Sequence, residues 1–538
     1  MYDLLLRGGR IVDGTAGPWF RADLGVVGDR IAAIGVLSRS GAEASGGTAV
    51  ATDARVVVEA EGLVVAPGFV DFHSHSDVSL LADPRAESAI RQGITTQLVG
   101  NCGFSAAPMG VEKRASYRRD GLMFSHDGYD WDWSSMAEYR QRLKHAAPAI
   151  NLLTLVGHTT LRVAVLGQAD RPASEADLAV MCQLLERALD DGAVGLSSGL
   201  TYTPGCYAPT AELTTLVDVL RGSGFGYHTH MRNYSAGLPT ALNEALEITD
   251  HASVPAFISH LYPAGREQWG TARQILRLLE AARERGSEVC FDVTPWLRGG
   301  GPMSQYVPGW ARAGGTSDLL ARLADREQRA VIRGELEAGV AGLRPHWADE
   351  LIVRVGLAAH SEWVGRSIAE LASARGQPPA DAALALLAED DGQIWVAPTS
   401  KSALDVDLLL SHPLGIPVTD GITVALDGPL GRPEMQKSFG TFPRVLGHYV
   451  RERGVLSLEA AVHKMTGEPA RRLGLRDRGL LRPGFAADVT VFDPARVQDD
   501  GDERSGGRYP TGIAYVIVNG QVSLAPDGRT AARAGRVL

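Results

Sequence analysis

Short apolar runs recur through the middle of the chain at a spacing that predicts alternating strands and helices. Stretches with a helical period separate most of these runs, as at residues 175–190 and 271–285. The eight runs expected to be buried parallel strands are Gly68–Phe72, Ile94–Val99, Asn151–Val156, Ala193–Leu196, Phe225–His228, Val254–Ile258, Glu288–Phe291 and Ile416–Val418. This order predicts an α/β fold, a (β/α)8 TIM barrel.

The two ends of the chain have a different pattern, with β-branched runs broken by glycine-containing turns. These runs are Tyr2–Val12, Asp23–Val27, Arg30–Gly35, Val56–Ala60, Ala487–Phe492 and Tyr515–Ser523. Neither end has enough strands to be stable alone, so we expect both ends to pair in one small β-sandwich domain. The predicted boundaries give this domain residues 1–62 and 480–538, and the barrel residues 63–479.

The segment between the seventh and eighth expected strands is much longer than an ordinary barrel crossover. It predicts an insertion at about residues 295–415. One interpretation is a lid over the mouth of an active site, and the other is a structural insertion unrelated to catalysis.

Composition excludes several classes of partner. Of the 538 residues, 45% are hydrophobic and 22% are charged, and the net charge of −10 is spread along the chain without a basic stripe. Nucleic acid is therefore not an expected partner. No apolar run has the roughly 18 residues of a membrane helix, and the first residues do not form a signal peptide. Four cysteines without disulfide spacing indicate a cytoplasmic protein, and whether it forms a homo-oligomer stays open.

Residues with metal-binding side chains follow the first two expected barrel strands. In a TIM barrel, catalytic side chains lie at the carboxyl ends of the strands. His73 and His75 follow the first strand two positions apart, so they can face one metal ion. Cys102 follows the second strand, either as a small buried residue or as a thiolate ligand. A thiolate combined with imidazoles favours zinc over magnesium or calcium.

Three further strands end in residues of the same kind. The fifth leads to His228 and His230, the sixth to His260 and the eighth to Asp420. All these side chains would converge on one mouth of the barrel, which indicates a single metal-dependent site. His228 and His230 share one face of their strand, so the spacing leaves either of them as the ligand.

Several motifs resemble the N-acyl-D-amino-acid deacylases, or D-aminoacylases, of the amidohydrolase superfamily. They are Val99–Ser105, Gly195–Tyr202, His230–Arg232, Ser259–His260 and Gly440–His448. The resemblance extends over nearly the whole chain. It implies a barrel fused to a small β domain and a zinc-dependent hydrolase that cleaves an amide bond with a metal-activated water.

The resemblance also implies roles for single residues. A tightly held zinc ion is assigned to Cys102, His230 and His260, and a weaker second position to His73 and His75, with Cys102 as a bridging ligand. Asp420 corresponds to the catalytic acid and base. The carboxylated lysine that is usual on the fourth strand in the superfamily has no counterpart in residues 193–198. Cysteine in the bridging role accounts for its absence.

One departure from the family concerns the substrate. The deacylases carry a His-Pro-Arg triplet where this chain has Met435-Gln436-Lys437. Lys437 is therefore a candidate anchor for a substrate carboxylate, although its ammonium lacks the fork of an arginine. Tyr202 is a second candidate substrate-binding residue or a packed aromatic ring.

Three functional hypotheses follow. The first is deacylation of an N-acyl-D-amino acid or a close relative, which is a small-molecule amide. The second is hydrolysis of a cyclic or otherwise unusual amide within the same superfamily. The third is a barrel scaffold without catalytic activity.

Overall fold

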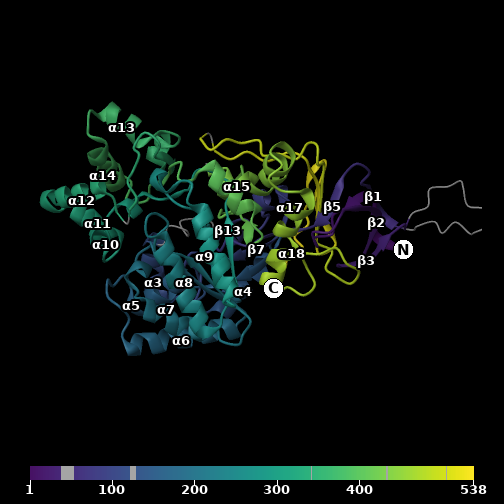
Figure 1. The fold of residues 1–538 in the computed structure, drawn as a ribbon, viewed down its shortest axis with the longest axis horizontal. Coiled ribbons are helices and arrows are strands. Elements are labelled where there is room, and N and C mark those ends of the chain that lie inside the picture. The colour runs from purple at the N-terminus through teal and green to yellow at the C-terminus, as the bar shows by residue number, and fades with distance from the viewer. Residues whose placement is uncertain (38–53, 121–128, 341, 432–433, 505) are drawn as a thin grey trace, which may run out of the picture.

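Eight parallel strands close into a barrel at the centre of the molecule, as the sequence predicts (Figure 1). The computed structural model describes residues 1–37, 54–120, 129–340, 342–431, 434–504 and 506–538. The barrel strands are β6 (Phe69–Asp71), β7 (Ile94–Val99), β8 (Asn151–Thr154) with its continuation β9 (Val156–Gly157), β10 (Gly195–Gly199), β11 (Gly226–His230), β12 (Ala256–Ile258), β13 (Val289–Val293) and β17 (Gly415–Pro417). A parallel bridge between Ser74 and Gly421 joins the first strand to the last.

Helices cover the outside of the barrel. They are α1 (Ser79–Ala82), α2 (Glu87–Arg91), α3 (Val111–Asp120), α4 (Met136–Ala146), α5 (His158–Leu166), α6 (Glu175–Asp190), α7 (Thr210–Asp218), α8 (Leu238–Ala252), α9 (Ala272–Glu284), α15 (Ala403–Ser411), α16 (Lys437–Arg444), α17 (Leu458–Met465) and α18 (Gly467–Arg472). The start of α6 has a local cause. The Ser174 hydroxyl accepts from the Asp177 backbone amide, and the Asp177 carboxylate accepts from the Ser174 amide.

Both ends of the chain contribute to one small β domain, at the right of Figure 1. Its strands form one connected nine-stranded sheet in the order β21-β20-β19-β18-β5-β1-β2-β3, with β4 paired to β1. They are β1 (Tyr2–Ile11), β2 (Phe20–Val27), β3 (Arg30–Gly35), β4 (Ala54–Glu59), β5 (Val64–Pro67), β18 (Val489–Phe492), β19 (Ile513–Val518), β20 (Gln521–Ala525) and β21 (Gly528–Arg529). Alternate apolar residues of both halves share one core, which includes Leu4, Leu24, Val489 and Ile517.

The long segment between β13 and β17 forms a unit with a core of its own, at the far left of Figure 1. Its elements are β14 (Gly301–Pro302), α10 (Gly309–Arg312), α11 (Thr316–Ala324), α12 (Arg326–Ala338), β15 (Leu351–Arg354), α13 (Ile368–Arg375), α14 (Pro379–Glu389) and β16 (Trp395–Ala397). Strands β14, β16 and β15 form a small antiparallel sheet. The next helix, α15, instead packs on α9, β13 and β17 and completes the barrel wall.

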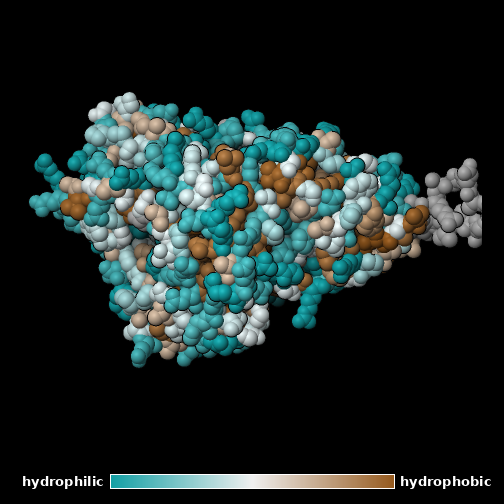
Figure 2. Space-filling model, in the orientation of Figure 1, coloured by the Kyte–Doolittle hydropathy of each residue, from teal (hydrophilic) through white to brown (hydrophobic). Residues whose placement is uncertain are grey.

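The surface in Figure 2 is mostly hydrophilic, with hydrophobic groups that include one over the end of the molecule where β1 to β3 lie. Within the described part of the chain, no helix has the length and apolarity needed to cross a membrane.

A buried polar network joins the β domain to the barrel. The Asp488 carboxylate accepts hydrogen bonds from the Asn151 side chain at 2.9 Å, from the Asn519 backbone amide at 2.7 Å and from the Arg478 guanidinium. Asp488 and Arg478 are only 6% and 5% exposed. Burial of such a pair is tolerated because the carboxylate has several donors around it.

Replacing Asp488 with alanine should therefore lower the free energy of unfolding by about 3–5 kcal/mol, because Arg478 would keep a buried charge without its partner. Urea unfolding followed by circular dichroism measures the change. Asp218→Ala is the matched control, since its ion pair with Arg221 is about half exposed on both sides and should contribute less than about 1 kcal/mol. Equal losses in the two variants would contradict this view of the domain junction.

Candidate active site

The carboxyl ends of five barrel strands bring the predicted site residues together. Their side chains are buried, apart from the partly exposed Asp420. His73 and His75 follow β6, Cys102 follows β7, His230 ends β11, His260 follows β12 and Asp420 follows β17. The (β/α)8 topology therefore collects residues that are far apart in the sequence at one mouth of the barrel.

Cys102, His230 and His260 form the first of two groups with metal-binding geometry. One ligand atom from each lies within 4.8 Å of the others, and Cys102 Sγ is 3.4 Å from His260 Nε2. Burial lowers the pKa of His230 to about 3 and that of His260 well below its ordinary value. Both imidazoles are therefore neutral at pH 7 and offer a lone pair to a cation.

The second group consists of His73, His75, Cys102 and Asp420. His73 Nε2 is 3.4 Å from Cys102 Sγ, and His75 Nε2 is 3.2 Å from Asp420 Oδ1. Burial lowers the pKa of His75 to about 4, so this imidazole is also neutral at pH 7. Cys102 belongs to both groups, which is the arrangement that a bridging ligand requires.

Asp292 on β13 is a site residue that the sequence analysis did not find. Its Oδ2 lies 3.0 Å from His73 Nδ1, and its Oδ1 accepts from the backbone amide of His260 at 2.5 Å. Burial alone would lower the pKa of His73, but the charge of Asp292 raises it well above its ordinary value. A carboxylate on the far nitrogen is the usual way to orient a metal-binding histidine. The feature of the sequence that could have revealed Asp292 is an acidic residue within the otherwise apolar strand 289–293.

The donor set fits a zinc ion. The Nδ1 atoms of His75, His230 and His260 are buried and have no hydrogen-bond partner among the described residues. Buried polar atoms usually have one, so a cluster of unpartnered ring nitrogens beside a thiol is suited to binding a cation. Thiolate, imidazole and carboxylate are the ligands that zinc takes in proteins.

His228 and His158 lie outside both groups. The His228 ring packs between Phe72 and Phe257, with ring centroids 5.2 and 4.7 Å apart. His158 Nε2 is 2.9 Å from the Glu212 carboxylate, at the start of α5. Of the two histidines on β11, the geometry therefore places His230 with the other ligands.

Asp420 is held as a carboxylate by its neighbours. Lys437 Nζ donates to its Oδ2 at 2.8 Å, while its Oδ1 faces His75. Burial alone would raise the pKa of Asp420, but the Lys437 ammonium and the hydrogen bond with His75 hold it well below its ordinary value. The ammonium of Lys437 is thus already paired, and the role of this lysine in substrate binding stays a prediction.

The backbone is strained at three of the site positions. Cys102, His260 and Asp420 have φ angles of 52°, 34° and 45°, in the left-handed region that side chains with a Cβ rarely adopt. Such conformations persist only where surrounding contacts enforce them, and they concentrate at functional sites.

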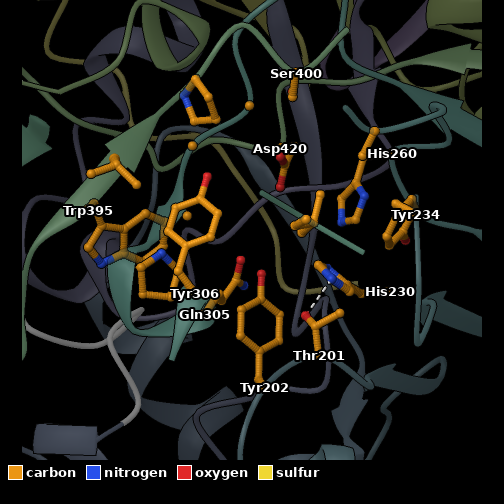
Figure 3. Close-up of a pocket in the computed structure, with 18 of the residues that line it drawn as sticks. Thr201, Tyr202, His230, Tyr234, His260, Gln305, Tyr306, Trp395, Ser400 and Asp420 are labelled. Carbon is orange, nitrogen blue, oxygen red and sulfur yellow. Dashed lines mark hydrogen bonds between the residues drawn. The ribbon is translucent and has the colours of Figure 1, made fainter. Parts of the chain in front are cut away.

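A cavity of about 440 Å³ opens beside the two groups. Figure 3 shows Tyr234, His230 and His260 on one side of it, with Tyr306, Gln305 and Trp395 on the other. The last three come from the segment between β13 and β17, so this insertion supplies one wall of the pocket. Tyr202 also lines the cavity, and its ring packs on His230 at 4.7 Å.

Comparison with known proteins identifies the family to which this chain belongs. The amidohydrolase family matches residues 56–291 and 338–524. D-aminoacylase of Alcaligenes xylosoxydans xylosoxydans is 34% identical over 100% of this chain and 97% of its own length. N-acyl-D-aspartate deacylase of the same organism is 34% identical over 100% and 95%. The chain belongs to the N-acyl-D-amino-acid deacylases of the amidohydrolase family.

A solved structure supports the same family assignment. N-acyl-D-glutamate deacylase of Bordetella bronchiseptica, in complex with zinc and a phosphonate mimic of the tetrahedral intermediate, has a TM-score of 0.81 and 32% identity, covering 100% of this chain and 99% of the other. This deacylase-family member is therefore a metal-dependent hydrolase of amide bonds, with the barrel and small β domain that the sequence predicts.

Purified protein should contain about one zinc ion per chain, bound through Cys102, His230 and His260. Cys102→Ala should lose most of this zinc, because the variant lacks the thiolate that both groups share. Cys290→Ala is the matched control, since Cys290 is an equally buried free cysteine outside both groups. Elemental analysis of the folded variants measures the difference. Full zinc occupancy in Cys102→Ala would remove this residue from the site.

Proposed function

We propose that the protein hydrolyses the amide bond of an N-acyl-D-amino acid, or of a close relative, with zinc as its metal. The observation that carries this proposal is the convergence of a thiol, neutral imidazoles and an ionised Asp420 at one end of a cavity. The relatives named as D-aminoacylase and N-acyl-D-aspartate deacylase support the substrate class.

In this proposal Cys102, His230 and His260 hold the principal zinc ion, and His73 and His75 belong to a weaker second position. When bound, zinc supplies Lewis acidity that lowers the pKa of water to about 7 and polarises a carbonyl group. Asp292 orients His73 through the 3.0 Å contact between its carboxylate and Nδ1. Thr201 orients His230 in the same manner, with its hydroxyl 2.8 Å from Nε2 (Figure 3).

Asp420 is the group that moves the proton. As a carboxylate at neutral pH it can accept a proton from water and then donate it to the leaving nitrogen. The second transfer is needed because an amide nitrogen leaves poorly without a proton. Lys437 and His75 position the two oxygens of Asp420 and keep it ionised before the reaction.

The remaining assignments are part of the same proposal. Tyr202 is a substrate-binding residue on the cavity wall. The barrel spans residues 63–479, and the insertion forms a lid over the mouth. All four cysteines are free, which supports action in the reducing cytoplasm. The complete set of site residues argues against a barrel scaffold without activity.

The purified zinc enzyme should release free amino acids from N-acetyl-D-amino acids faster than from the matched L enantiomers. A panel of paired D and L substrates, with amine release measured by a fluorogenic reagent, tests this preference. A cyclic amide such as a hydantoin belongs in the panel as the competing substrate class. Turnover of the cyclic amide alone would overturn the proposal.

Asp420→Asn should fold and keep its zinc while turnover falls about 10²–10⁴-fold, the usual contribution of general acid–base catalysis. Asparagine retains the shape of the side chain but cannot carry the proton. Steady-state kinetics and zinc analysis on the same preparation separate the effects. Near-normal kcat would exclude Asp420 as the proton carrier, and loss of zinc would make it mainly a ligand.

A further inference from the structure

Lys401 is a buried lysine on the cavity wall without an ion-pair partner among the described residues. It is 4% exposed and lies between β16 and α15. Its Nζ donates to the Thr294 hydroxyl and lies 4.5 Å from the centre of the Tyr262 ring. An ammonium group has three donors, and burial of a charge is costly unless an opposite charge compensates it. The remaining donors of Lys401 are therefore suited to an anion in the cavity.

The position of Lys401 is close to the reacting groups. Tyr262 follows the zinc ligand His260 by two residues, and Thr294 follows Asp292 by two residues. The ammonium therefore packs against the ends of β12 and β13, beside the metal-binding groups. In Figure 3, Ser400, the chain neighbour of Lys401, lies on the same side of the cavity as Asp420 and His260.

Two other cations of the cavity wall already have acidic partners. Lys437 is bound to Asp420 at 2.8 Å, and Arg232 to Glu244 at 2.9 Å. A substrate anion would have to compete with these carboxylates. Lys401 forms no direct ion pair in the described part of the chain, and the carboxylates of Asp420, Glu503 and Asp292 act on its ammonium only from a greater distance.

Arg312 is the strongest alternative. It also lines the cavity and has no ion-pair partner among the residues that the structure places. However, its guanidinium donates to the carbonyl of Thr201 at 3.1 Å, and it also borders a second, smaller cavity near Asp120. Arg312 therefore lies between two cavities, whereas Lys401 lines only the main cavity, beside His260.

We propose that Lys401 binds the carboxylate of the substrate, an assignment that rests on the proposed deacylase function. In an N-acyl amino acid this carboxylate is attached to the carbon next to the scissile nitrogen, so its anchor must lie beside the zinc ligands. Lys401 meets this requirement because its ammonium contacts Tyr262 and Thr294, which lie two residues after His260 and Asp292. Burial lowers the pKa of Lys401 to about 8, which leaves the ammonium charged at neutral pH.

The test compares N-acetyl-D-leucine with N-acetyl-D-leucinamide, in which a neutral carboxamide replaces the carboxylate. Lys401→Met should lower kcat/KM for the acid about 10- to 100-fold, the usual range for a hydrogen bond to a charged group. The loss should fall mainly on KM, because the contact is the same in the ground and transition states. The carboxamide should react with the variant as it does with the unmodified enzyme. Circular dichroism and zinc content verify that the variant folds.

Two control variants distinguish Lys401 from the neighbouring cations. Lys437→Met should lower kcat for both substrates, because it acts through Asp420. Arg312→Met should leave the ratio of the two substrates unchanged. A selective loss for the acid in Arg312→Met, or an equal loss for both substrates in Lys401→Met, would overturn the assignment.

A binding measurement separates this assignment from the proposed function. Calorimetry of the product D-leucine, which retains the carboxylate, should show about 10- to 100-fold weaker binding to Lys401→Met than to the unmodified zinc enzyme. Equal binding by the two proteins would overturn the role of Lys401, whatever the turnover. Failure of the unmodified enzyme to hydrolyse any N-acyl amino acid would instead overturn the proposed function.

Discussion

Hydrogen bonds between the first and last strands close the barrel and place its catalytic groups. The Asp420 amide donates to the His73 carbonyl at 3.0 Å, and the His75 amide donates to the Gly421 carbonyl at 2.8 Å. The Thr419 hydroxyl donates to the buried Asp71 carboxylate at 2.7 Å. These bonds fix the backbone on both sides of the seam, so the two histidines and Asp420 face each other before a metal or substrate binds. The other candidate ligands lie at the ends of strands in the same closed barrel, so this closure also brings them to the same mouth.

Closure alone does not account for the direction of every side chain. Cys102, His260 and Asp420 have a left-handed backbone just after the ends of their strands, at the positions where their ligand atoms converge. Each such residue costs about 1–3 kcal/mol. Contacts across the barrel maintain the strain at two of them, since Asp292 holds the amide of His260 and the His73 carbonyl holds that of Asp420. Catalytic geometry and stability therefore oppose each other at these positions.

Much of the architecture was predictable because its determinants are local. The apolar run Ile94–Val99 is a strand with those limits, and the capping residues Ser174 and Asp177 define the start of α6. The histidines, Cys102 and Asp420 could be found because strand ends in a barrel share one mouth. The strands at the two ends of the chain paired as expected because neither set could bury its apolar face alone.

The rest depends on tertiary contacts that no spacing reveals. Asp292 and Thr201 act on histidines from other strands. The pairing of Lys437 with Asp420 could not be read from the sequence, because it depends on how α16 packs against the barrel mouth. Nothing in the sequence pointed to Lys401 either, because the residues that contact its ammonium, Tyr262 and Thr294, follow β12 and β13.

The two sides of the cavity have separate origins in the chain. Strand ends supply the metal-binding groups and Asp420, whereas Gln305, Tyr306 and Trp395 belong to a segment with its own hydrophobic core. Most of that core lies within the segment, although Trp395 packs with the barrel core, so Gln305 and Tyr306 are the wall positions that can be substituted with least effect on the barrel strands. The residues that carry out the reaction and those on the facing wall of the cavity thus lie in separate segments of the sequence. Such a division makes the chain a natural scaffold for retargeting, in which the catalytic half is kept and the facing wall is redesigned.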